Sequence, residues 1–84
     1  MRLRRPVAVV EWDDAFIETS DFTAKKATKT EPCRRTTVGV LVAQTDDGVV
    51  LATDEYDKEE YGYAARMFIP WGMVTKWYVL EIVG

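Results

Sequence analysis

The sequence predicts a small all-β fold, a five-stranded and strongly bent sheet that curls into a barrel. Short β-branched and apolar runs are separated by polar breaks that contain glycine or proline, which is the pattern of consecutive strands. The runs between breaks are too short for a stable helix. A chain of 84 residues has room for one core, so residues 1–84 form one domain, with the barrel at about 7–83 and a long polar loop at about 13–35.

The first strand is expected at residues 7–12, where β-branched residues follow Pro6. Proline is tolerated at such an entrance because its missing N–H costs least there. The stretch that follows, up to Pro32, is mostly polar and does not alternate. It is therefore expected to be a loop, in which Asp13 or Asp14 could cap one helical turn.

A β-hairpin is expected next, with strands at 36–44 and 49–53. Between them, Asp47 and Gly48 form a pair that provides the positive φ of a tight turn. Gly39, inside the first of these strands, indicates a bend or bulge, the device by which a small sheet curls on itself. This residue favours a barrel over a flat sheet.

The last two strands are expected at 63–69 and 74–83, after an acidic loop at 54–62. The turn that separates the two strands begins at Pro70. A helical interpretation of 63–69 is disfavoured, because Pro70 and the flanking glycines leave too few residues for a stable helix.

Composition argues against catalysis. Histidine is absent, and no base is placed to activate a serine, lysine or aspartate. The one cysteine, Cys33, has neither a histidine to activate its thiol nor a second cysteine to pair with. The acidic residues of 54–62 lack the spacing of a calcium-binding loop. The sequence therefore predicts a protein that is not an enzyme, with no catalytic residue, no cofactor and no metal site.

The formal net charge is −3, which is unlike the basic footprint of a domain that binds duplex DNA. The charge is polarised: residues 1–37 hold eight basic and six acidic residues, and residues 38–84 hold three basic and eight acidic. No apolar run approaches the length of a membrane span or a signal-peptide core. A single unpaired cysteine is typical of a reducing compartment. We therefore expect a cytoplasmic protein without a membrane partner.

Three segments carry a family resemblance: residues 37–42, 46–52 and 68–74, with Val-Gly-Val-Leu-Val and Ile-Pro-Trp-Gly as their specific parts. They resemble the five-stranded barrels of Sm-like and SH3-like proteins, and they are similar to short phage-encoded proteins of metagenomic type whose function is uncharacterised. The resemblance implies a ring-forming barrel in the cytoplasm of an infected cell. The RNA-binding residues of Sm proteins do not transfer, because Asp46-Asp47-Gly48 lacks the asparagine and Trp71-Gly72 replaces Arg-Gly.

The last strand is apolar on both faces, with Tyr78 and Leu80 on one face and Trp77 and Val79 on the other. Either a bend switches faces within the strand, or a partner covers the outer face. The fourth and fifth strands of such a barrel also have free edges with few guarding charges. We therefore expect a non-catalytic binding module that self-associates, with a candidate subunit interface at Ala64, Arg66, Phe68, Trp77, Val79 and Val83.

The alternative is an Sm-like ring that binds single-stranded RNA through a basic groove and a stacking platform. The candidate residues for this function are Lys25, Lys26, Lys29, Arg34, Arg35 and Trp71. The basic residues also have a simpler explanation, since a polar loop is normally charged because it faces water. A protein partner other than a second copy stays open, as does the number of subunits.

Overall fold

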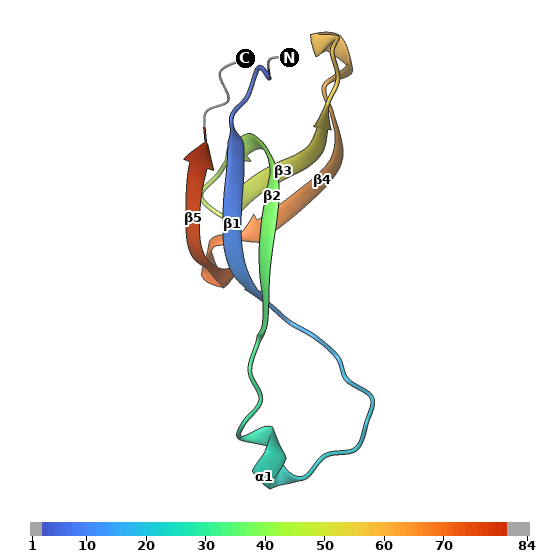
Figure 1. Ribbon diagram of the computed structural model, residues 1–84, viewed down its shortest axis with the longest axis vertical. Helices are drawn as coiled ribbons and strands as arrows, with labels where there is room; N and C mark the ends of the chain where they lie inside the picture. Colours follow the sequence, from blue (N-terminus) through green and yellow to red (C-terminus); the bar gives the residue numbers. More distant parts are fainter. Residues whose placement is uncertain (1–2, 81–84) are drawn as a thin grey trace.

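The computed structural model describes residues 3–80, which form one five-stranded antiparallel sheet (Figure 1). The predicted all-β class and the five predicted strands are confirmed. In chain order the elements are β1 (Val7–Asp14), α1 (Ala24–Ala27), β2 (Cys33–Gln44), β3 (Gly48–Glu55), the 3₁₀ turn η1 (Glu59–Tyr61), β4 (Tyr63–Pro70), the 3₁₀ turn η2 (Trp71–Met73) and β5 (Val74–Leu80). The predicted last strand beyond Leu80 lies outside the described residues.

The strand order is β4-β3-β2-β1-β5, so β4 and β5 are the two edges of the sheet. The expected free edges of these two strands are confirmed for the part of the chain that the structure describes. The predicted closed barrel is not confirmed, because β4 and β5 are not paired with each other in residues 3–80. The two strands are joined by η2. At this corner no hydrogen-bonded ladder links β4 to β5, and the side chains of Trp71 and Trp77 pack on the core instead.

The sheet bends along β2, so that β3 and β4 cross behind β1 and β2 (Figure 1). The register of β2 against β3 shifts between Leu41 and Ala43, three residues after the predicted position at Gly39. Gly39 is therefore not the site of the bulge, but it contributes to the bend in another way. A Cβ atom at this position would lie 2.9 Å from the carbonyl oxygen of Ala52, so glycine permits the close approach of β3.

The core lies on the concave face of the bent sheet. Paired residues of antiparallel strands share a face, so Val10 of β1 and Trp77 of β5, which are paired, both point to this side. Its buried members are Ala8, Val10, Trp12, Leu41, Val49, Leu51 and Ile69, with Trp71, Val74 and Trp77 packed against them.

Three other buried hydrophobic side chains, those of Val9, Val40 and Ala52, do not belong to this core cluster. The register places Val40 opposite Ala52, and successive residues of a strand point to opposite faces. These three residues therefore lie on the outer face. The central strands are apolar on both sides of the sheet.

Residues 15–32, called the arm here, join β1 to β2 and project away from the sheet (Figure 1). The radius of gyration is 16.6 Å, whereas a compact chain of this length has about 12 Å. The long polar loop is confirmed, but it is shorter than predicted because β1 runs to Asp14 and β2 begins at Cys33. Its helical turn is α1, capped by the Thr23 side chain, so the prediction of an Asp13 or Asp14 cap is wrong.

The turn between β2 and β3 is built on Thr45. Its backbone N–H donates to the carbonyl oxygen of Gly48 over 2.9 Å, and its Oγ1 accepts from the backbone N–H of Asp47 and of Gly48. Gly48 does not have a positive φ, so the predicted reason for this glycine is wrong. A Cβ atom here would collide with the carbonyl oxygen of Ile69 and with the Phe68 ring, which is the physical reason for glycine.

Strand β4 contains one left-handed residue that is not glycine. Ala65 has a φ of 56°, and the β3–β4 pairing passes from Ala52 opposite Arg66 to Asp54 opposite Ala64 without pairing Ala65. A left-handed alanine costs roughly 1–2 kcal/mol. The pairing resumes at Ala64 and Tyr63, so β4 is irregular at this one position.

Replacing Gly48 by alanine is expected to destabilise the fold by roughly 1–3 kcal/mol, because the added methyl group overlaps backbone and ring atoms. Thermal unfolding measured by circular dichroism checks this. Gly72→Ala is the matched control, since nothing lies within 4 Å of its added Cβ. Equal melting temperatures for the two variants would contradict the explanation given for Gly48.

Replacing Ala65 by glycine is expected to stabilise the protein by about 1 kcal/mol, or roughly 4–8 °C in melting temperature, because glycine adopts the positive φ without strain. Differential scanning calorimetry provides the measurement. Ala64→Gly, one residue earlier in the same strand, should lower the melting temperature instead. If both variants are destabilised, Ala65 is not strained.

Candidate interaction surfaces

The two edge strands carry exposed apolar side chains. In β4, Met67 and Phe68 are 38% and 49% exposed, and in β5 Tyr78, Val79 and Leu80 are between 42% and 46% exposed. Burial of such side chains is favourable, and contiguous apolar surface is typical of an interaction site. The edges therefore combine unpaired backbone groups with apolar area.

The predicted interface residues lie on different faces. Arg66 and Phe68 of β4 lie on the outer face, because they are paired with Ala52 and Val50. Ala64 lies beyond the kink at Ala65, opposite Asp54. Contact of any of these residues with a second copy stays a prediction.

In β5, the choice of Trp77 and Val79 as interface residues assumed that both face outward, and this is wrong, because both lie on the inner face. Trp77 packs on the core, with its ring centroid 5.3 Å from that of Trp71. Val79 shares this inner face, since it is paired with Ala8, and it is exposed at the open edge. Val83 lies outside the described residues.

The outward residues of β5 are instead Tyr78 and Leu80. They continue two rows of apolar residues across β2 and β1, which form an apolar patch on the outer face, called the outer strip here. Its rows are Val38, Val9 and Tyr78, and Val40, Val7 and Leu80. The double apolar face of the last strand indicated such a surface, but the register against β1 decides which residues of β5 belong to it.

The candidate nucleic-acid residues are not gathered in one place. Lys25, Lys26 and Lys29 lie on or beside α1 at the far end of the arm, whereas Trp71 lies in η2 on the sheet (Figure 1). Arg34 and Arg35 lie in β2, where each has a carboxylate partner. The Arg34 Nε atom lies 3.7 Å from Asp13 Oδ1, and Arg35 Nη1 lies 3.0 Å from Asp14 Oδ2.

Trp71 has a structural role, and its stacking on RNA bases stays a prediction. Its indole Nε1–H donates to the carbonyl oxygen of Thr45 over 2.7 Å, and its backbone N–H donates to the carbonyl oxygen of Asp47 over 3.2 Å. The side chain is partly buried against the core. Trp71 thus fastens the β4–β5 corner to the β2–β3 turn.

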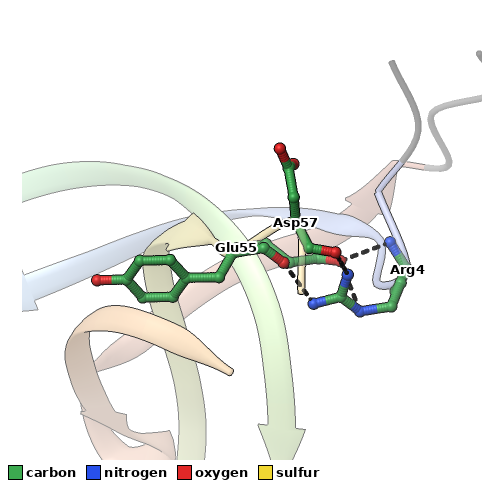
Figure 2. A network of polar contacts seen from close by, with 4 residues as sticks. Arg4, Glu55 and Asp57 are labelled. Carbon is green, nitrogen blue, oxygen red and sulfur yellow. Dashed lines mark hydrogen bonds and ion pairs between the residues drawn. The ribbon is translucent and has the colours of Figure 1, made fainter. Parts of the chain in front are cut away.

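The acidic loop is bound by an arginine that sequence reasoning did not consider (Figure 2). The Arg4 guanidinium donates to the carbonyl oxygens of Tyr56 and Asp57 over 2.7 and 3.2 Å, and its Nε lies 3.2 Å from Glu55 Oε1. The Glu55 side chain is only 3% exposed. Among the described residues no donor reaches its Oε2 atom. Separation of about fifty residues along the chain explains why no local pattern indicates this contact.

Residues 3–80 contain no group of three or more histidine, cysteine or acidic side chains arranged to hold a metal ion. Cys33 is exposed at the base of the arm, with its thiol free. Among the helices described, none is both long and apolar enough to span a membrane.

Comparisons of this chain with protein-family models, with curated proteins and with solved structures found no match. Its function must therefore be argued from its own surfaces.

Replacing Arg4 by methionine is expected to cost roughly 1–3 kcal/mol, because the nearly buried Glu55 carboxylate loses its cationic partner. The double variant with Glu55→Gln should regain part of this loss, since no charge is then left unpaired. Urea unfolding of both variants measures the difference. A double variant that is less stable than Arg4→Met alone would show that the ion pair is not what matters here.

Proposed function

We propose that this protein is a non-catalytic binding module that assembles with copies of itself through the edges of its sheet. The observation that carries the proposal is that, within residues 3–80, each edge strand is paired on one side only and exposes apolar side chains. An edge presents a row of free N–H and C=O groups that template pairing with another strand.

The edges have little protection against such pairing. Within residues 3–80, Arg66 is the only charged residue of β4 and Lys76 the only one of β5. Proteins that avoid edge association normally use several charges or a covering segment. Pro70 and the left-handed Ala65 limit pairing on β4 to the residues between them.

Pairing β4 of one copy with β5 of the next would be a head-to-tail contact. Such contacts close into a ring when the rotation permits and otherwise form a filament. A ring agrees with the Sm-like or SH3-like barrel and the phage origin that the resemblance implies, both of which are part of this proposal. Assembly in a reducing cytoplasm would leave Cys33 as a thiol.

Binding of single-stranded RNA is the second candidate, favoured by the exposed lysines of the arm. Lys25, Lys26 and Lys29 form no ion pair within residues 3–80. Three acidic residues of the same arm, Glu18, Asp21 and Glu31, balance their charge. Affinity for phosphates requires net positive charge at the contact, so the edge proposal has the stronger support.

The change Phe68→Lys, on the edge strand β4, should lower the oligomer mass, because it places a charge where an apolar contact is proposed. Light scattering coupled to size exclusion measures the mass, and the melting temperature should fall with dilution for the wild type. Gln44→Lys adds the same charge on the inner strand β2 and should leave the mass unchanged.

A wild-type protein that is monomeric at micromolar concentration, with a melting temperature independent of dilution, would contradict self-association. RNA that copurifies and is lost on Lys25→Gln, Lys26→Gln and Lys29→Gln would favour the second candidate instead.

A further inference from the structure

A hollow of about 360 Å³ lies over β2, β3 and β4 and shares no residue with the arm or the outer strip. Its size is within the range of small-molecule sites, roughly 300–1,000 Å³. The walls are mostly apolar, formed by Val42 of β2, Val50 and Ala52 of β3, and Ala64 of β4. Val50 and Ala52 lie on the outer face of the sheet, as does Arg66. The hollow therefore opens on that face.

Among the described residues, Arg66 is the one charged side chain that lines the hollow. It is exposed, and it forms no ion pair within residues 3–80. Arginine stays protonated in proteins, and its planar guanidinium can donate two parallel hydrogen bonds to one carboxylate. The hollow thus combines apolar walls with one available cation.

No acidic side chain of residues 3–80 lines this hollow. On the outer face of β3, Asp54 follows Ala52 and lies opposite Ala64 of β4. Its Oδ2 accepts a hydrogen bond from the Thr53 hydroxyl over 3.4 Å, and it forms no ion pair with Arg66. An anion in the hollow would therefore meet one cation and no carboxylate on the walls.

The left-handed residue Ala65 lines the same hollow. It interrupts the pairing of β3 with β4 between the pairs Ala52–Arg66 and Asp54–Ala64, so the irregular part of this ladder coincides with the cavity. Strained backbone positions cluster at ligand sites, where the strain is part of how the site is shaped. This observation is independent of the charge on Arg66.

We propose that this hollow binds a small organic carboxylate with an apolar substituent. The carboxylate accepts hydrogen bonds from the Arg66 guanidinium, and the substituent lies on Val42, Val50 and Ala52. One guanidinium neutralises one carboxylate, whereas a polyanion brings further charges that a chain of net charge −3 repels. Edge pairing uses backbone groups in the plane of the sheet, so this site on the outer face does not depend on the proposed self-association.

Hexanoate is the probe, titrated at neutral pH into isotope-labelled protein and followed by the chemical shifts of the backbone amides. The largest shifts should fall at residues 42, 50–52 and 63–66. Acetate has the charge without the chain, and hexan-1-ol has the chain without the charge. Each should bind more weakly than hexanoate by roughly tenfold or more, because each makes only part of the contact.

Two variants test the two parts of the site. Arg66→Gln should weaken hexanoate binding by roughly tenfold or more, because the carboxylate loses its charged donor. Lys76→Gln removes the same charge from the other edge strand and is the matched control, which should bind like the wild type. Ala64→Leu fills the hollow without changing the charge and should also weaken binding. Circular dichroism verifies folding, and Arg66→Lys, which keeps the charge but not the planar donor pair, should retain part of the affinity.

Hexanoate that binds Arg66→Gln as tightly as the wild type would overturn the site, as would hexan-1-ol that binds as tightly as hexanoate. Shifts concentrated at Lys25, Lys26 and Lys29, or no shifts at millimolar hexanoate, would overturn it as well. A wild-type protein that is monomeric but still binds hexanoate through Arg66 would contradict only the proposed self-association.

Discussion

The hydrogen bond from the Trp71 indole to the carbonyl oxygen of Thr45, 2.7 Å long, ties the β4–β5 corner to the β2–β3 turn. The strands β4 and β5 are the two edges of the sheet, and β2 and β3 are inner strands. This bond therefore holds the connection between the edges against a turn between inner strands. The same side chain packs on the core and against Trp77. A bent sheet that is open between its edges can in this way enclose a core.

An open sheet of this size leaves two kinds of surface uncovered. Within residues 3–80, the outer sides of its edge strands lack hydrogen-bond partners, and its outer face carries exposed apolar side chains. A small domain buries a smaller fraction of its surface than a large one does. Covering these surfaces with copies of the same chain needs no further sequence, which is why we propose self-association.

Ion pairs determine which positively charged side chains are free to contact other molecules. Arg34 and Arg35 are engaged by Asp13 and Asp14 at the base of the arm, and Arg4 is engaged by Glu55 and the backbone that follows it. The lysines at the tip of the arm are the cations left exposed at that end. Exposed ion pairs contribute little stability, so the two pairs at the base add little to the β1–β2 ladder that they flank.

Local patterns in the sequence were sufficient for the strands, the long polar loop and the free edges, because alternation, β-branching and proline act over a few residues. Tertiary contacts decided the rest. Trp77 belongs to the core and Tyr78 to the outer face because the register of β5 against β1 selects one of two equally apolar faces. Gly48 is required by the approach of Ile69, and the Arg4–Glu55 pair joins residues about fifty positions apart. No local pattern encodes such distances, since they arise only when the bent sheet brings remote strands together.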